Sequence, residues 1–275
     1  MAFARMRFLA ALLTCMLVSG MALAVHVISP VSTEIAEGPQ IAMGTAGPGQ
    51  TFYVVADPVV ASGGRFNQGG AYDQMSASAL PEGWSSAPSK LYAKPLQTDV
   101  TIPKDAPDGE YIVYFSLWDE AGEAGLGQNV TFAATVQVSR DVMEMKVEPS
   151  SQSVGAGQPA RYAITINNKG IANDVFLVGS SGVRDWEFQR SIYITSGTSK
   201  TVSYEVVGND EADYTVKIWA RSSSSENINS KAPVSLRVNT DLLSDFRATT
   251  NGVLLFPLPE APLYFIAGLM SNLFP

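Results

Sequence analysis

Gly47-Pro48-Gly49-Gln50-Thr51-Phe52-Tyr53 recurs as Gly155-Ala156-Gly157-Gln158-Pro159-Ala160-Arg161-Tyr162. After each copy comes a tryptophan and then an acidic turn leading into a strand that begins with tyrosine: Trp84 and Tyr111 first, Trp186 and Tyr214 second. The copies are offset by 108 residues at the glutamine, 102 at the tryptophan and 103 at the tyrosine. A period of this length fits one small all-β domain and exceeds that of a solenoid repeat. The sequence therefore predicts a duplicated β domain.

The first predicted domain covers residues 25–140. It opens with an extended, proline-punctuated segment from Ile28 to Pro39, after which alternating apolar and polar residues predict half-buried strands. The predicted strands are 52–55, 91–93, 100–102, 111–118 and 131–138. The Gly- and Ser-rich interval 61–79 is too long for a hairpin, so it is expected to form an elaborated loop.

The second predicted domain covers residues 141–239 and has the clearer pattern. Its seven predicted strands are 143–147, 161–166, 174–178, 191–194, 199–207, 214–220 and 234–238. Asn and Gly residues at 167–170 and 208–210 supply turns, because both tolerate positive φ. The predicted fold class is all-β, with two tandem immunoglobulin-like β-sandwiches followed by an apolar C-terminal tail at residues 240–275.

The second domain contains a set of motifs in this order: Val147-x-Pro149, Gly155 to Gln158, Tyr162 to Gly170, Trp186, Ser199 to Val207 and Tyr214-Thr215-Val216. They resemble motifs of the CARDB/NEW3-type immunoglobulin-like domains of archaeal and bacterial exported surface proteins. The first domain matches less fully, through Leu80 to Trp84 and Ile102 to Tyr111. The resemblance implies an extracellular spacer or adhesion module, with no catalytic residues to carry over.

Residues 1–24 read as a secretory signal peptide. Arg5 and Arg7 precede an apolar run, and the small residues ending in Ala22-Leu23-Ala24 predict cleavage after Ala24. The alternative is an uncleaved anchor, because Phe8 to Ile28 contains no Asp, Glu, Lys or Arg and is long enough to span a bilayer. In both cases the two repeats lie outside the membrane, so the predicted location is extracellular, at the cell surface and membrane-associated.

The composition argues against catalysis, a cofactor and a nucleic-acid partner. His26, the only histidine, lies at the predicted signal boundary, and Cys15, the only cysteine, lies inside the apolar run, so Ser-His-Asp and Cys-His catalysis and a His-based zinc site are not expected. A glycosidase that uses two carboxylates stays formally open. The chain carries 18 basic and 26 acidic residues, a net charge of −8, which disfavours nucleic acid.

Two acidic turns, at 105–110 and 210–213, could offer oxygen ligands to calcium. They lack the EF-hand spacing, and Asp and Gly residues commonly build such turns without a ligand. We therefore predict no metal site and no cofactor.

Aromatic side chains on the sheets give a second functional candidate, a carbohydrate-binding module. Within the strand from Tyr111, Tyr114 and Trp118 share one face with Ile112 and Ser116, whereas Val113, Phe115 and Leu117 share the other. In the repeat, Trp219 falls on the face of Thr215 and Lys217. Exposed rings at these positions could stack on sugar rings of a polysaccharide, although such rings are often covered by a neighbouring loop.

Asn129-Val130-Thr131 is the only N-glycosylation sequon in the chain. Its predicted position at a strand edge of an exported domain makes Asn129 a candidate for modification.

The C-terminal run from Gly252 to Phe274 contains one charged residue, Glu260. Pro257, Pro259 and Pro262 interrupt it, and the helix-capable remainder, Leu263 to Phe274, is too short to span a bilayer. Such an apolar segment marks an interaction site, so residues 252–275 are expected to dock on a membrane surface or an envelope protein subunit, or to cap the second domain. The candidate docking residues are Leu254, Leu255, Phe256, Leu263, Tyr264, Phe265, Ile266, Leu269, Met270, Leu273 and Phe274.

Taken together, these features predict a non-enzymatic exported surface or envelope protein that acts as a structural or adhesion module. The apolar C-terminus would hold it at the membrane or in an envelope complex.

Overall fold

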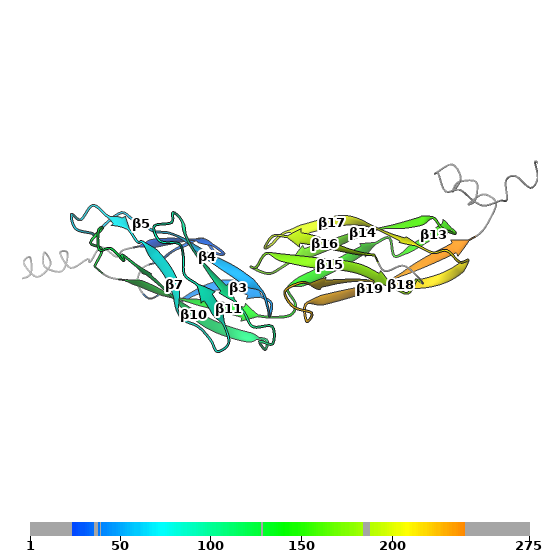
Figure 1. Ribbon diagram of the computed structural model, residues 1–275, viewed down its shortest axis with the longest axis horizontal. Helices are drawn as coiled ribbons and strands as arrows, with labels where there is room; N and C mark the ends of the chain where they lie inside the picture. The colour runs from blue at the N-terminus through cyan, green and yellow to red at the C-terminus, as the bar shows by residue number, and fades with distance from the viewer. Residues whose placement is uncertain (1–23, 36–37, 39, 128, 184–187, 240–275) are drawn as a thin grey trace, which may run out of the picture. The chain divides into compact units, whose positions relative to one another are not determined.

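The computed structural model describes residues 24–35, 38, 40–127, 129–183 and 188–239. The chain divides into two compact units, of which the first comprises residues 1–142 together with Gly170–Asn173 and the second comprises Met143–Lys169 together with residues 174–275. All the regular elements of the described part are β-strands, and no helix in that part is long and apolar enough to cross a membrane. Figure 1 shows each unit as packed strands joined by loops.

The first unit is a sandwich of two sheets with strand orders β2-β1-β4-β9-β8 and β3-β11-β10-β7. The strands of the first sheet are β1 (Val25–Ser29), β2 (Thr33–Ile35), β4 (Thr51–Asp57), β8 (Ser85–Ala87) and β9 (Leu96–Thr101). Those of the second are β3 (Gln40–Ala46), β7 (Gln74–Ala79), β10 (Gly109–Trp118) and β11 (Val130–Val138). A small separate pair is formed by β5 (Val59–Val60) and β6 (Gly70–Ala71).

The second unit is a sandwich of sheets β12-β14-β17 and β13-β19-β18-β15-β16. The strands of the smaller sheet are β12 (Met143–Glu148), β14 (Pro159–Asn168) and β17 (Ser199–Val207). Those of the larger sheet are β13 (Ser151–Gly155), β15 (Asp174–Ser181), β16 (Gln189–Ile194), β18 (Ala212–Ser222) and β19 (Asn229–Asn239).

Both units have the strand order of an immunoglobulin-like sandwich. The first strand is split between the sheets: β1 and β12 pair antiparallel with β4 and β14, whereas β3 and β13 pair parallel with the last strands, β11 and β19. The remaining strands divide as in the Greek-key arrangement, with the last two strands paired as neighbours in the sheet opposite the second strand. The predicted fold class is thus confirmed for both copies.

The duplicated sequence forms the same turn in both units. Gly49 and Gly157 have φ of 76° and 74°, and Gln50 and Gln158 donate their backbone N–H groups to the carbonyls of Gly47 and Gly155. Positive φ at the third position is typical of a type II turn and favours glycine there. The glutamine side chain closes each turn a second time, because its Oε1 accepts the N–H of Gly47 at 2.7 Å or of Gly155 at 3.3 Å.

A second shared feature is the tyrosine at the third position of the strand after the acidic turn, Tyr111 in β10 and Tyr214 in β18. The Tyr111 hydroxyl donates to the Pro107 carbonyl at 3.1 Å, and the Tyr214 hydroxyl donates to the Asp210 carbonyl at 3.0 Å. Each bond reaches back four residues across the turn, which is the tyrosine corner of immunoglobulin-like domains. Trp84, 8% exposed, packs on the Tyr111 ring at 5.4 Å, as expected for a residue that closes one end of the sandwich.

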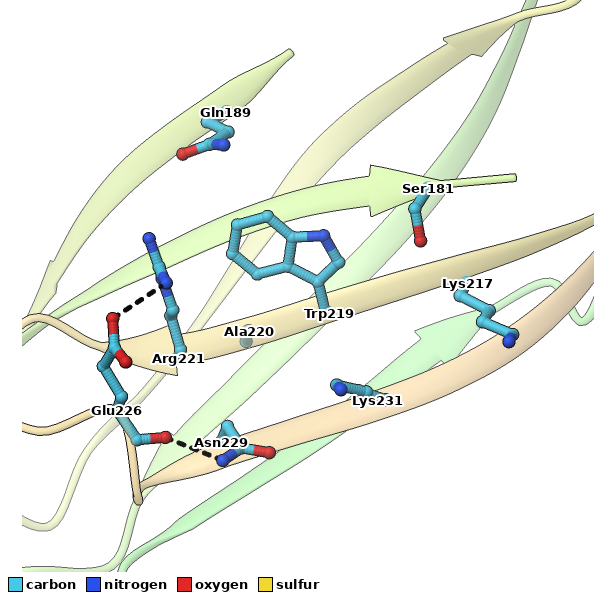
Figure 2. A pocket seen from close by; sticks show the side chains of 9 residues that line it. All are labelled: Ser181, Gln189, Lys217, Trp219, Ala220, Arg221, Glu226, Asn229 and Lys231. Carbon is cyan, nitrogen blue, oxygen red and sulfur yellow. Dashed lines mark hydrogen bonds and ion pairs between the residues drawn. The ribbon is translucent and has the colours of Figure 1, made fainter. Parts of the chain in front are cut away.

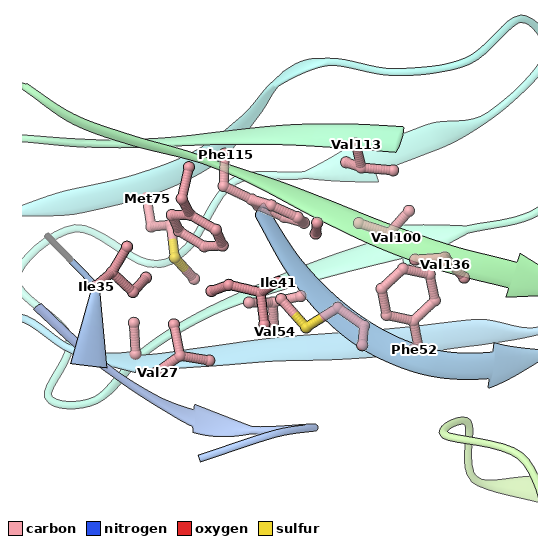
Figure 3. Packing of buried hydrophobic residues seen from close by; sticks show 14 of the residues in the cluster. Val27, Ile35, Ile41, Phe52, Val54, Met75, Val100, Val113, Phe115 and Val136 are labelled. Atoms are coloured by element: carbon pink, nitrogen blue, oxygen red, sulfur yellow. The ribbon is translucent and has the colours of Figure 1, made fainter. Parts of the chain in front are cut away.

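Alternating side chains of the paired strands build the core of the first unit (Figure 3). On β10, Val113, Phe115 and Leu117 are fully buried, and the predicted division of this strand into two faces is confirmed. The Phe115 and Phe132 rings stack with centroids 5.2 Å apart. Burial of such side chains contributes about 25 cal/mol per Å² of apolar surface and is the main stabilising term.

Two predictions for the first domain were wrong. The expected loop 61–79 contains β7, whose Met75 is fully buried and which pairs with β10. Ser and Ala have weak strand propensity, so only the pairing reveals β7 as a strand. The expected strand 91–93 is instead an exposed turn in which Tyr92 has φ of 58°.

In the second unit, all seven predicted strands are present and one was missed. The missed strand is β13, which pairs in parallel with β19 from Ser151↔Ser235 to Gly155↔Asn239. Its polar sequence Ser-Gln-Ser-Val-Gly has no clear apolar alternation, so its position depends on the long-range pairing.

Candidate functional site

The outer face of the larger sheet in the second unit carries Trp219 at the centre of a regular array. The register places Gln189, Gly179, Trp219 and Lys231 in one row across β16, β15, β18 and β19. Ser181 and Lys217 form the next row on one side, and Arg221 and Asn229 are paired on the other side. Because alternate residues of a strand point to the same face, these side chains surround the indole (Figure 2).

Gly179 makes room for the indole. A Cβ at this position would lie 2.4 Å from Cζ2 of Trp219, 2.8 Å from Cε2 and 3.0 Å from Cη2. The six-membered ring therefore lies over the backbone of β15, at a position that any larger residue would occupy. A ring held in this way is a fixed, half-exposed platform.

Basic side chains flank this platform. The Arg221 guanidinium lies 5.5 Å from the indole centroid and pairs with Glu226 at 3.3 Å. Within the described residues, Lys217 and Lys231 are in no ion pair. The Asn229 side chain donates to the Glu226 backbone carbonyl at 2.8 Å, which fixes the loop between β18 and β19.

The array borders an open groove of about 610 Å³. Its lining contains one carboxylate, that of Glu226, beside the three basic side chains. Two other cavities described in this structure also contain one carboxylate each, from Asp213 and Glu148. None of these three cavities brings together the pair of carboxylates that a glycosidase needs.

The other two predicted stacking residues lie in the first unit. Tyr114, 48% exposed, and Trp118 are on the outer face of β10, and the Trp118 Nε1–H donates to the Glu120 carboxylate. Their cross-strand neighbours are small or uncharged: Ala79 and Ala133 beside Tyr114, and Gln74 beside Trp118. The three aromatic residues therefore belong to two separate surfaces with different surroundings.

The acidic turns are engaged in ion pairs with basic residues. Asp108 pairs with Arg140 at 2.6 Å, and Asp213 pairs with Arg237 at 2.7 Å. The hydrogen bond from Arg237 lowers the pKa of the Asp213 carboxyl and raises that of Arg237 itself. In the described part of the chain, no three His, Cys, Asp or Glu side chains are grouped so that they could hold a metal ion.

A buried carboxylate in the second unit also has structural partners. Asp174, at the start of β15, accepts hydrogen bonds from the Ser222 hydroxyl at 2.6 Å and the Ser224 hydroxyl at 3.0 Å. It thereby fixes the chain that leaves β18. Full engagement of a buried acid in this way is typical of a structural role.

Asn129 is exposed and directly precedes β11, which is the position expected for an accessible sequon. Residues 1–23 of the predicted signal peptide, Trp186 and the C-terminal range 240–275 lie outside the described residues. The latter range includes all the predicted docking residues from Leu254 to Phe274.

Sequence reasoning identified Trp219 but missed most of the residues around it. Lys217 was already placed on the face of Trp219, and Arg221 could have been found in the same way, since it alternates with Trp219 along one strand. Gly179, Gln189 and Lys231 could not, because their proximity depends on the pairing of four strands.

No family model matches the chain, and no curated protein does. Among solved structures, a chimeric titin Z1Z2 is similar at 14% identity and a TM-score of 0.35, covering 81% of this chain and 100% of that one. A CARDB domain from Pyrococcus furiosus, solved in complex with di-metal ions, is similar at 18% identity and a TM-score of 0.28, covering 36% and 90%. A β-glucosidase from Listeria innocua, in complex with glucose, is similar at 15% identity and a TM-score of 0.26, covering 34% and 16%.

At such identities and TM-scores these structures lend no function to the chain. The immunoglobulin-like assignment rests on the strand order and the two tyrosine corners.

Proposed function

We propose that this chain is a non-enzymatic exported protein of the cell surface or envelope, in which two immunoglobulin-like sandwiches serve as a structural or interaction module. The observation that carries the proposal is that the duplicated glutamines and tyrosines are used to build the scaffold. Gln50 and Gln158 close turns, and Tyr111 and Tyr214 close corners. What is repeated is thus architecture, and function is expected on the surfaces that differ.

The surroundings of the histidine and of the carboxylates support a non-enzymatic function. His26 shares a hydrogen bond with Ser32 at 3.2 Å on β1 of the first sandwich, where Glu34 and Asp57 are its cross-strand neighbours, and it lines none of the three cavities described above. The cavities described above each hold one carboxylate, and buried Asp174 is held by serine hydroxyls. These arrangements suit structure and binding rather than acid–base catalysis.

Export is supported by the place where the sandwich begins. Val25 and Val27 of β1 are fully buried in the core, directly after the predicted cleavage position at Ala24. These residues belong to a folded domain, so an uncleaved anchor would have to end before them and would retain only residues 8–24 of the apolar run. Cleavage after Ala24 leaves the whole sandwich intact.

The apolar tail is proposed to hold the protein at a membrane surface or an envelope subunit. Deletion of Gly252 to Pro275 is expected to move the protein from the membrane fraction to the soluble fraction, with unchanged circular dichroism. A full-length variant with Leu269, Met270 and Leu273 replaced by serine should do the same, because it loses apolar surface without losing chain length. Retention of either variant on membranes after signal cleavage would show that the tail is not the anchor.

Salt and detergent extraction distinguish the two docking partners. A tail that inserts its apolar side chains among lipids resists high salt and is released by detergent, and it should bind protein-free vesicles. A tail seated on an envelope subunit should not bind such vesicles.

A carbohydrate-binding module is the second candidate, and one observation favours it. The Trp219 indole is held over Gly179 at the floor of an open groove with amide and basic side chains around it. The narrower assignment of the second sandwich to the CARDB/NEW3 type stays part of this proposal, supported by the motifs at Gly155 to Gln158 and Tyr162 to Gly170.

A further inference from the structure

The charge around Trp219 is opposite to that of the chain. The whole protein has 18 basic and 26 acidic residues, whereas the groove is lined by Lys217, Arg221 and Lys231 and by one acid, Glu226. That acid is already paired with Arg221, so the two lysines present the unbalanced charge. A local excess of positive charge on an acidic protein favours an anionic ligand.

The remaining side chains of the groove suit a sugar. The Trp219 ring is fixed over Gly179, and Figure 2 shows the amide groups of Gln189 and Asn229 on strands to either side of it. A rigid ring stacks on the apolar face of a pyranose, and amide groups form hydrogen bonds with its hydroxyls. Together with the lysines, these groups match the apolar faces, hydroxyls and negative charges of an acidic sugar.

We infer that this face of the second sandwich binds an acidic polysaccharide, whose uronate or sulfate groups pair with Lys217 and Lys231 while one sugar ring stacks on Trp219. The inference rests on the interaction-module part of the proposed function and is independent of how the chain is anchored. Single-stranded nucleic acid is the competing polyanion, and the test below compares it directly.

Tyr193 provides a second contact for a polymer. It is 54% exposed and lies opposite Val175 on the same outer face as Gln189, four residues away along β16. At about 3.3 Å per residue this separation is roughly 13 Å along the strand, so a single sugar cannot reach both rings. An extended chain of several sugars can, and the site should prefer polymers to monosaccharides.

The test uses the full-length mature protein in detergent and isothermal titration with polygalacturonate, dextran sulfate and neutral dextran. Binding is expected for the first two and not for dextran, and comparing the first two separates uronate from sulfate recognition. Trp219→Ala should weaken binding about tenfold, the loss of one stacking contact. A double Lys217→Gln and Lys231→Gln variant should weaken binding and reduce its dependence on salt.

Matched variants separate the site from general effects. Gly179→Ala keeps every charge and should weaken binding by displacing the indole, whereas Trp219→Phe should retain most of it. Tyr193→Ala should affect long chains and leave short oligosaccharides unchanged. Trp118→Ala, which removes the aromatic ring beside the Glu120 carboxylate on the first sandwich, should have no effect. Circular dichroism and urea unfolding verify that each variant is folded.

Several results would overturn the inference: equal binding by Trp219→Ala and the parent, equal binding of neutral dextran, or tighter binding of single-stranded DNA through the same residues. Polysaccharide binding can be tested independently of membrane anchoring. The variant that lacks Gly252 to Pro275 retains the Trp219 groove and should bind polygalacturonate as the parent does.

Discussion

The two sandwiches share their corners and differ in their outer faces. Both close the duplicated turn with a glutamine and the acidic turn with a tyrosine. The aromatic face of the first unit has Tyr114 between two alanines and Trp118 beside the Glu120 carboxylate, whereas that of the second has Trp219 among lysine and arginine. The turns and corners stabilise each domain, whereas the outer faces determine what each domain contacts. We therefore expect the two units to be stabilised in the same way and to bind different partners.

The largest expected effect on stability comes from removing a buried aromatic ring from either core. Phe115→Ala and Phe176→Ala each remove a fully buried ring and should lower the free energy of unfolding of their own unit by about 3–5 kcal/mol. Hydrogen exchange followed by peptide mass spectrometry should show faster exchange in β10 and β11 for the first variant and in β15 and β18 for the second. A loss below about 1 kcal/mol in one unit would mean that its core is not equivalent to the other.

The glutamine turns should differ between the copies. Gln50 is fully buried and accepts at 2.7 Å, whereas Gln158 is half-buried and accepts at 3.3 Å. Gln50→Ala should therefore cost about 1–3 kcal/mol and Gln158→Ala about 0.5–1.5 kcal/mol, since an unsatisfied buried N–H is the costlier loss. Urea unfolding measures both, and a larger effect at Gln158 would contradict the ranking by burial.

The tyrosine corners should be equivalent. Tyr111→Phe and Tyr214→Phe each remove one hydroxyl bond of similar length and should each cost about 0.5–1.5 kcal/mol without altering the fold. Thermal unfolding of the pair of variants provides the measurement. A clear inequality would contradict the equivalence of the two hydroxyl bonds.

The smallest expected effect is electrostatic. The hydrogen bond from Arg237 lowers the folded-state pKa of Asp213, so its stabilising contribution is present above the unfolded-state pKa of about 3.9 and is lost as pH falls through the folded value. Asp213→Asn should therefore be slightly less stable than the parent at neutral pH and equal to it in strong acid. Urea unfolding at the two pH values measures this, with Asp108→Asn as the matched variant in the first unit. A difference in unfolding free energy between Asp213→Asn and the parent that grows as the pH falls would contradict the prediction, because the ion pair is lost in acid.

Much of the fold could be predicted because its signals are local. In the second unit, Val, Ile and Tyr alternate along each long strand, and all seven predicted strands are present. Strands β1 and β3 were missed although buried Val25 and Val27, and buried Ile41 and Met43, alternate along them. Two other missed strands lack that signal, namely β7 with Ser and Ala and β13 with its polar sequence. Such strands are specified by pairing with β10 and β19, and a pairing between distant segments leaves no mark in the sequence of either.

Of the candidate site, the sequence identified Trp219 and its neighbour Lys217 on the same strand. Trp219 was identified from strand alternation, yet the sequence joined it with Tyr114 and Trp118, which belong to the other unit. Nothing in the sequence placed Gly179 beneath the ring or Lys231 beside it, because residues 179, 219 and 231 meet only through the register of three strands.

By itself, the sequence determined the duplication, the all-β class, the turns that need glycine and the tyrosines near the start of their strands, because each depends on residues a few positions apart. Only the tertiary structure decided which polar residues are scaffold and which are free to bind. That choice depends on long-range partners, since the same aromatic residue is part of the core, a corner or a platform according to the strands beside it.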